Sequence, residues 1–293
     1  MRFMMLMIPK VYQGAEGKNI RDDFAPGADD VEKMTRYNED LSKAGVLISL
    51  DGLHPAAKGA RISFPAGKPR VTDGPFTEAK EVLGGYWIIQ TGSKEEAIEW
   101  AKRCPAQDGD VIEVRPIFEM TDFPPDTQRA AESSAVRAQP ERQRRSCNIT
   151  LHISNREKPM RFVCLGYMDE KRWETMTESE RSNFMDECFT YDDVIRRNGH
   201  FVGGEGLQSA RSAATLRYKN ARVSVTDGPF AETKEQIGGI MLLEARDLNH
   251  AIELMSKHPS LRLGEGCWEL RPAADLTAMV TESERRRSKT NVV

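Results

Sequence analysis

The chain contains one segment twice, and this internal repeat constrains the fold more than any other feature of the sequence. Val71–Gly85 recurs as Val225–Gly239, with the shared pattern T-D-G-P-F-x-E-x-K-E-x-x-G-G, and eleven of the fifteen positions are identical. The same offset of 154 residues aligns Tyr37 with Tyr191. Two copies are too few for a solenoid, and each is long enough to fold alone, so we expect a duplicated domain.

The boundaries of this duplication follow from composition. We expect repeat 1 in residues 1–120, a linker in 121–159, repeat 2 in 160–275 and a basic, disordered tail in 276–293. The linker is rich in proline, serine and arginine and has no apolar period. Ile149, Leu151 and Ile153 alternate with polar residues there, which indicates a short additional strand.

Both repeats show the same order of secondary-structure patterns. An apolar first strand precedes a long amphipathic helix, near Asp30–Ala44 and Thr177–Asn198, which a glycine ends. A hairpin, the repeated motif, an apolar strand, a second helix beginning at Ser93 or Asp247, and a final strand follow. The order β-α-β-β-α-β with a hairpin elaboration predicts an α+β fold of two ferredoxin-like modules.

Composition excludes several classes of protein. The 293 residues have a net charge of -3 and no basic excess, so a nucleic-acid partner is not expected. The five cysteines form no C-x-x-C pair, which favours reduced thiols in a cytoplasmic protein. Because the apolar start of the chain ends at Pro9, it indicates a buried strand rather than a signal peptide or a membrane span.

The repeated motif resembles the D-G-P-F branch of the YCII-related family, over residues 1–118 and 160–273. The resemblance implies ferredoxin-like modules that pair face to face, so the tandem chain would form an intramolecular dimeric α+β barrel. The better-known YCII branch has a histidine in the first helix and an aspartate late in the second. This chain has Tyr37 and Tyr191 in its first helices and lacks that pair, so the dyad is not carried over.

The motif has two interpretations. Asp73 and Asp227 precede Gly-Pro and could accept backbone N–H groups across a turn, with Pro75 and Pro229 beginning a helix and a phenylalanine anchoring the turn. Under that interpretation the following charged residues form local ion pairs. The alternative is a polar rim around a ligand site. Repetition does not separate the two, because a duplicated fold needs its turns twice.

The last strand of each repeat offers a second candidate. Alternation places Glu113 and Arg115 on one face of the strand, and Glu269 and Arg271 repeat the pattern. If the opposite, apolar face packs on the helices, the charged face points into the barrel, where a buried Glu–Arg pair often marks a binding cavity. The alternative is a solvated ion pair on an edge strand.

Together these patterns give a set of ligand-pocket candidates with no assigned catalytic residue. The candidates are Asp73, Glu78, Lys80, Glu81, Glu113, Arg115, Asp227, Glu232, Lys234, Glu235, Glu269 and Arg271. No metal site or cofactor is expected, because no known cofactor motif is present and lysines accompany the carboxylates. The histidines have no counterpart in the other repeat, which argues against two equivalent histidine sites but leaves one asymmetric site open.

Two functions follow as hypotheses. The first is a protein that binds an unknown small molecule in a polar pocket of the barrel, with or without enzymatic activity. The alternative is a regulatory or interaction module that acts with an extracytoplasmic-function sigma factor, because genes of the resembling branch tend to lie beside such factors. The chain would be a monomer with an internal pseudo-dimer, or a homodimer.

Overall fold

The computed structural model describes most of both repeats. The described residues are 1–13, 20, 24, 26–65, 68–76, 82–123, 128, 159–231, 233, 235–262, 266–274 and 285. The expected linker strand at Ile149–Ile153 and nearly all of the expected tail lie outside these residues.

In the described residues, repeat 1 has six strands and two α-helices, and repeat 2 has the same order with one additional helix, α5. Its elements are β1 (Arg2–Ile8), α2 (Ala28–Lys43), β2 (Leu47–Leu53), β3 (Ala60–Ser63), β4 (Arg70–Asp73), β5 (Gly85–Gln90), α3 (Lys94–Lys102) and β6 (Val111–Pro116). Repeat 2 contains β7 (Met160–Met168), α5 (Glu170–Thr175), α6 (Glu178–Arg197), β8 (Phe201–Gly206), β9 (Ala214–Lys219), β10 (Arg222–Asp227), β11 (Gln236–Ala245), α7 (Leu248–Met255) and β12 (Cys267–Ala274).

Helices α3, α6 and α7 begin where the sequence signals place them, α2 begins two residues before the expected Asp30, and α5 was not predicted. Ser93 accepts the backbone N–H of Glu96 at 3.2 Å, and Asp247 accepts that of His250 at 2.8 Å. Thr177 and Glu180 form a reciprocal capping box at the start of α6. These side chains satisfy N–H groups that the first turn leaves without a partner, which fixes the start of each helix.

Two features differ from the sequence expectations. Strands β2 and β8 were not predicted, because Gly52 in one and Gly203, Gly204 and Glu205 in the other interrupt the apolar alternation. Pro229 does not begin a helix, because residues 228–231 have irregular backbone, whereas the residues after Phe76 that would test Pro75 lie outside the described part of the chain.

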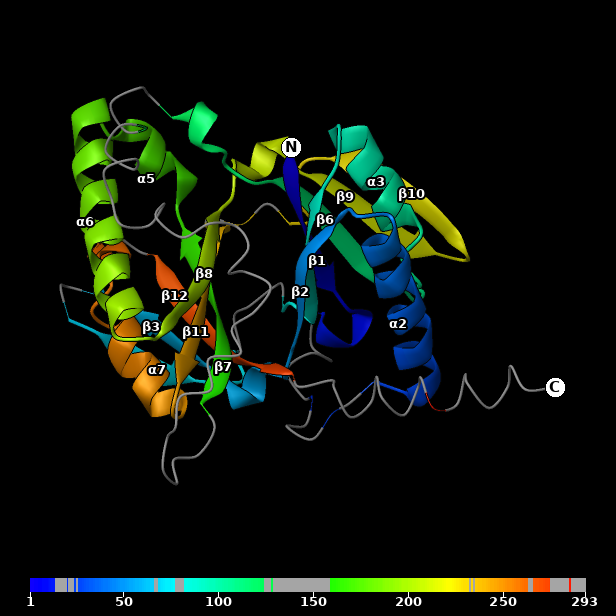
Figure 1. The fold of residues 1–293 in the computed structure, drawn as a ribbon, viewed down its shortest axis with the longest axis horizontal. Helices are drawn as coiled ribbons and strands as arrows, with labels where there is room; N and C mark the ends of the chain where they lie inside the picture. Colours follow the sequence, from blue (N-terminus) through cyan, green and yellow to red (C-terminus); the bar gives the residue numbers. More distant parts are fainter. Residues whose placement is uncertain are drawn as a thin grey trace.

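Strand pairing joins both repeats into one closed barrel. The strands run in the order β6-β1-β5-β2-β12-β7-β11-β8. Strand β2 pairs with β12 through Leu53 and Ala273, and an isolated bridge between Ile117 and Leu207 closes the other junction. Figure 1 shows α2 and α3 on one outer side of these strands and α6 and α7 on the other. The α+β fold with two ferredoxin-like modules in an intramolecular dimeric barrel is therefore confirmed.

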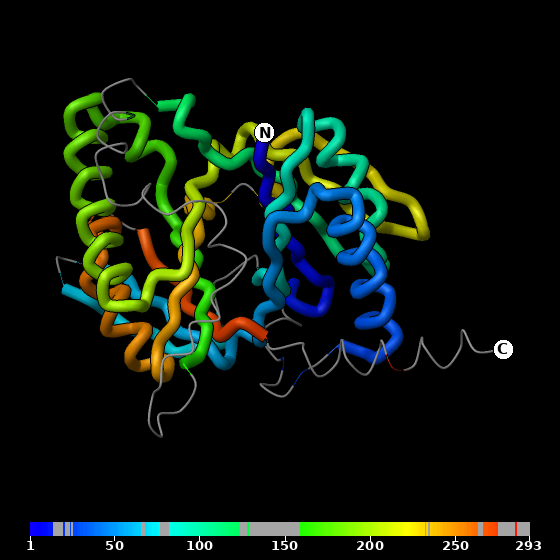
Figure 2. The backbone as a smooth tube through the Cα atoms, in the orientation of Figure 1, coloured from blue at the N-terminus to red at the C-terminus, as the bar shows by residue number. Residues whose placement is uncertain are grey.

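Each hairpin pairs with the last strand of the other repeat. Strand β3 pairs with β12, and β9 pairs with β6. Figure 2 shows this exchange, with the yellow hairpin of repeat 2 beside the blue and green tube of repeat 1. The hairpin side chains are buried accordingly: Leu216 and Tyr218 enter the core beneath α2 and α3, and Ile62 enters the core beneath α7.

The barrel interior and the helix-facing side contain separate cores. Met4, Leu6 and Ile8 face the interior together with Val163 and Leu165 of repeat 2. On β6 and β12 the apolar residues Ile112, Val114, Trp268 and Leu270 face the helices. Because side chains alternate along a strand, Glu113, Arg115, Glu269 and Arg271 face inward.

The paired glycines after the motif allow close backbone approach. A Cβ atom on Gly85 would lie 2.9 Å from the carbonyl oxygen of Asp51, and one on Gly239 would lie 2.8 Å from that of Glu205. Glycine at these two positions therefore allows the neighbouring strands to approach closely in both repeats.

Candidate functional site

The inward-facing charges of the last strands lie in two clusters, each at a junction between the repeats. Glu113 and Arg115 are 3% and 1% exposed, and both Glu269 and Arg271 are 0% exposed. The solvated ion pair on an edge strand is therefore wrong for both strands. Every other residue of each cluster comes from the opposite repeat.

The Glu269 cluster consists of Glu269, Arg271, Arg61, His54 and Leu83. Arg271 donates from Nε to the carbonyl of His54 at 2.8 Å and from Nη1 to that of Leu83 at 2.6 Å, and its Nη2 also donates to His54. Its Nη1 lies 3.5 Å from Oε1 of Glu269. All three nitrogens of Arg271 thus serve to join β12 to the loops of repeat 1.

Arg61 completes the Glu269 cluster from the exchanged hairpin. It lies directly opposite Glu269 in the β3–β12 register and donates from Nε and Nη2 to Oε2 of Glu269, at 3.0 and 2.7 Å. Its guanidinium group also packs over the rings of Phe76, at 4.5 Å, and Tyr167, at 5.1 Å. Phe76 of the repeated motif therefore packs on the arginine that bonds to Glu269 of the other repeat.

The two arginines of this cluster differ electrostatically. Burial lowers the pKa of Arg271, and the neighbouring Glu269 carboxylate only partly opposes that effect. Burial also lowers the pKa of Arg61, but attraction to Glu269 and its hydrogen bonds outweigh burial, so the net direction is upward. Arg61 remains 21% exposed in its side chain, whereas Arg271 is fully enclosed.

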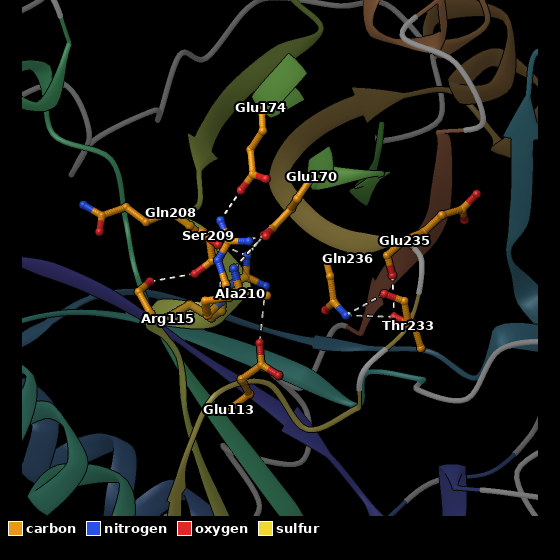
Figure 3. A network of polar contacts seen from close by, with 12 residues as sticks. Glu113, Arg115, Glu170, Glu174, Gln208, Ser209, Ala210, Thr233, Glu235 and Gln236 are labelled. Atoms are coloured by element: carbon orange, nitrogen blue, oxygen red, sulfur yellow. Dashed lines mark hydrogen bonds and ion pairs between the residues drawn. The ribbon is translucent and has the colours of Figure 1, made fainter. Parts of the chain in front are cut away.

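The Glu113 cluster consists of Glu113, Arg115, Glu170, Gln208 and Phe230. Oε2 of Glu113 accepts the backbone N–H of Phe230 at 2.8 Å, and Oε1 lies 3.3 Å from Nη1 of Arg115. Nη2 of Arg115 donates to the carbonyl of Gln208 at 2.8 Å and lies 3.8 Å from Oε1 of Glu170. Figure 3 shows Glu113 and Glu170 on opposite sides of Arg115.

Glu170 is held in place by the loop that follows β8. Its Oε1 accepts the backbone N–H of Ala210 at 2.6 Å, and its Oε2 accepts the hydroxyl of Ser209 at 2.8 Å. Nε of Arg115 is buried and has no hydrogen-bond partner among the residues that the structure describes. The Glu113 cluster therefore has two carboxylates around one guanidinium group.

The clusters occupy equivalent positions but contain different charges. The residue opposite Glu269 is Arg61, and the residue opposite Glu113 is Thr215. Arg217, two residues further along β9, donates to the carbonyl of Phe230 and the hydroxyl of Thr226 instead of a carboxylate. As defined by their described residues, the Glu269 cluster has two guanidinium groups and one carboxylate, whereas the Glu113 cluster has one guanidinium group and two carboxylates.

The aspartates of the motif lie away from both clusters. Asp73 and Asp227 end β4 and β10 and are exposed. Asp227 is 97% exposed in its side chain and lies 3.9 Å from Nζ of Lys94. Within the described residues neither carboxylate accepts a backbone N–H, so the expected self-capped turn is not observed there.

The other charged residues of the motif mostly lie outside the described residues. This holds for Glu78, Lys80, Glu81, Glu232 and Lys234. Glu235 is half-buried, and its carbonyl accepts the hydroxyl of Thr233 at 2.5 Å. The motif contributes one phenylalanine to each cluster. The ring of Phe76 packs on Arg61, and the backbone N–H of Phe230 donates to Glu113.

Sequence reasoning missed the partners that the opposite repeat supplies. Arg61, Glu170 and the carbonyl groups of His54 and Gln208 carry no motif of their own. The 154-residue offset could have drawn attention to Arg61, since it aligns with Thr215 and marks a charge difference between the copies. Among the described residues, no group of three or more His, Cys, Asp or Glu side chains is arranged to hold a metal ion.

A second polar group, which the sequence did not predict, lies on the helix side of repeat 2. His258 is 5% exposed and lies between Asp192 of α6 and Ser260, which follows α7. The acid is on the first helix of the module and the histidine follows the second. His258 therefore has an acidic and a hydroxyl partner, and at the offset of 154 residues Cys104 stands at its position in repeat 1.

Comparisons with known proteins agree with the duplication. The YCII-related domain model matches residues 1–121 and 160–277. An uncharacterised protein of Rhizobium meliloti (strain 1021) is 30% identical over 115 residues, which are 39% of this chain and 93% of that protein. The relative therefore has about the length of one repeat.

Solved structures with similar overall arrangement are distant. A putative chlorite dismutase has a TM-score of 0.43 at 10% identity, covering 96% of this chain and 99% of the other. A variant chlorite dismutase from Candidatus Nitrospira defluvii has a TM-score of 0.37 at 8% identity, covering 96% and 94%. None of the described helices is long and apolar enough to cross a membrane. With both matched segments covering most of its length, the chain belongs to the YCII-related domain family.

Proposed function

We propose that the protein binds a small anionic molecule at the Glu269 cluster. The observation that carries this proposal is the excess of guanidinium groups there, with Arg61 at its outer edge. Nε and Nη2 of Arg61 bond to Glu269, while Nη1 makes no hydrogen bond within the described residues. A carboxylate or phosphate group is the natural partner of such a donor.

The environment of Arg61 favours binding over a purely structural role. Its guanidinium plane is fixed by Glu269 and by the rings of Phe76 and Tyr167, so little side-chain entropy remains to be lost on binding. The side chain is partly exposed, which leaves a route for a ligand. Arg271 adds a second positive charge behind it in a buried setting, where attraction is weakly screened.

The test is ligand-induced stabilisation with a panel of small carboxylates and phosphates. Saturating ligand at about 100 times its Kd should stabilise the folded protein by about 2.7 kcal/mol and raise Tm by several degrees. Arg61→Thr installs the residue found at the equivalent position of repeat 2 and should weaken binding at least tenfold.

Arg217→Ser is the matched control, because it also removes a hairpin arginine and installs the residue that aligns with it in repeat 1. It should leave affinity unchanged. Equal weakening by both variants would show that the anion binds elsewhere. If no anion stabilises the wild type while a sigma factor co-purifies with it, the regulatory alternative would replace this proposal.

A further inference from the structure

Three side chains of repeat 2 form a continuous hydrogen-bonded chain outside the barrel. Nε2 of His258 lies 3.3 Å from Oδ1 of Asp192, and Nδ1 lies 2.6 Å from Oγ of Ser260. The backbone N–H of Ser260 also points at Nδ1, at 3.2 Å. A nucleophile and an orienting acid are thus each within hydrogen-bonding distance of the same base, His258.

The partners fix the tautomer of His258. Because Nδ1 accepts the backbone N–H of Ser260, the ring proton belongs on Nε2, where the Asp192 carboxylate accepts it. The lone pair of Nδ1 also faces the Ser260 hydroxyl at the shorter distance of 2.6 Å, so it can take up the hydroxyl proton. Trp268 donates from Nε1 to Oγ of Ser260 at 2.7 Å, which favours negative charge on that oxygen.

Aromatic rings hold the imidazole in this orientation. Tyr191 packs edge-to-face against His258 with ring centroids 5.6 Å apart, and Trp268 packs against it at 5.4 Å. Tyr191 is itself fixed by a 2.6 Å hydrogen bond from its hydroxyl to the carbonyl of Leu254. The base therefore has a single packed position, as a catalytic geometry requires.

Repeat 1 shows that the module does not need these polar residues in order to fold. At the offset of 154, Asp192, His258 and Ser260 align with Asn38, Cys104 and Ala106. The supporting tyrosine is retained, since Tyr37 donates to the carbonyl of Trp100 at 2.9 Å just as Tyr191 does to Leu254. The same backbone is thus built with an amide, a buried thiol and a methyl group.

We infer that Ser260 is a nucleophile activated by His258, with Asp192 as the positioning residue, and that it accepts acyl groups from small activated esters. Oγ of Ser260 attacks the ester carbonyl carbon while its proton moves to Nδ1 of His258. Collapse of the adduct breaks the bond to the alkoxide, which leaves with that proton as the alcohol. Water then attacks the acyl-serine with the same proton transfer and releases the carboxylic acid.

The experiment is covalent labelling of the intact protein with a fluorophosphonate probe, followed by peptide mass spectrometry. We expect one adduct, on Ser260, and a burst of p-nitrophenol from p-nitrophenyl acetate. Ser260→Ala should abolish both. His258→Gln should slow labelling by roughly 10²-fold to 10⁴-fold, the usual contribution of a general base.

The controls separate positioning from folding. Asp192→Asn installs the repeat 1 residue, so Tm should be unchanged while labelling slows about tenfold or more, and Asp192→Glu should recover part of the rate. Ser209→Ala removes a hydroxyl that bonds to Glu170 rather than to an imidazole, and should leave labelling intact. Absence of labelling in the folded wild type, an adduct elsewhere, or an undiminished rate in His258→Gln would overturn the inference.

Discussion

The two repeats of this chain build the same backbone and fill its polar positions differently. Both place a Glu-x-Arg strand inside the barrel and a tyrosine under the second helix. Only repeat 1 contributes a hairpin arginine that lies opposite the inward glutamate of the other repeat. Only repeat 2 has the group of Asp192, His258 and Ser260. Shared residues therefore mark what the fold requires, and differing residues mark where each copy was free to change.

The largest difference should appear when each buried glutamate is removed. Glu269→Ala leaves the two guanidinium groups of Arg61 and Arg271 without their carboxylate and should lower the free energy of unfolding by about 3–5 kcal/mol. Glu113→Ala should cost less, about 1–3 kcal/mol, because Glu170 still faces Arg115. Denaturant unfolding of both variants measures this, and equal losses would contradict the proposed charge asymmetry.

The exchanged hairpins should show the next largest effect. Arg61→Thr removes two charge-assisted hydrogen bonds to Glu269 and should cost about 1.5–3 kcal/mol. Arg217→Ser removes bonds to an uncharged carbonyl and a hydroxyl and should cost about 1 kcal/mol. Urea midpoints would distinguish the two. A larger loss in Arg217→Ser would mean that the β9 hairpin, not β3, is the more strongly held one.

The shared glycines should behave alike in both repeats. Gly85→Ala and Gly239→Ala each force a Cβ atom against a carbonyl oxygen of the neighbouring strand and should cost about 1–3 kcal/mol. Gly203→Ala is the control, since a Cβ atom there meets nothing within 4 Å. Thermal unfolding measures the loss of Tm in each variant. Unequal losses in Gly85→Ala and Gly239→Ala would mean that the two modules differ in backbone packing at this position.

The smallest effect is expected at the aspartates of the motif. Both carboxylates are exposed, and neither accepts a backbone N–H within the described residues. The double variant Asp73→Asn/Asp227→Asn should therefore unfold at the same denaturant concentration as the wild type. A clear loss of stability would restore the turn-capping role that the sequence suggested.

Much of the fold could be predicted because its signals are local or repeated. Capping residues such as Ser93, Thr177 and Asp247 act on backbone within three residues, so their meaning is readable in the sequence. Strands β2 and β8 escaped prediction because glycine and acidic residues within them carry little strand preference. Their place in the sheet comes from pairing with β5 and β11.

The candidate site could likewise be predicted only in part. Alternation along β6 and β12 predicted that the glutamate and the arginine of each last strand share one face, but it left open whether that face is inward or solvated. The structure buries Glu113, Arg115, Glu269 and Arg271. Their partners Arg61 and Glu170 were not predicted, because each lies in the other repeat. The motif and the charged strands were separate candidates in the sequence, whereas in the structure Phe230 bonds to Glu113 and Phe76 packs on Arg61, the partner of Glu269.

By itself, the sequence determined that this protein is a duplicated α+β module, where the two main helices of each repeat lie and which residues of each last strand share a charged face. These properties depend on periodicity and on contacts between near neighbours. Only the tertiary structure decided that each hairpin joins the other repeat, and that Asp192 and Ser260 meet at His258. Backbone hydrogen bonding between strands is nearly independent of side-chain identity, so alternation specifies a face of a strand but not its partner.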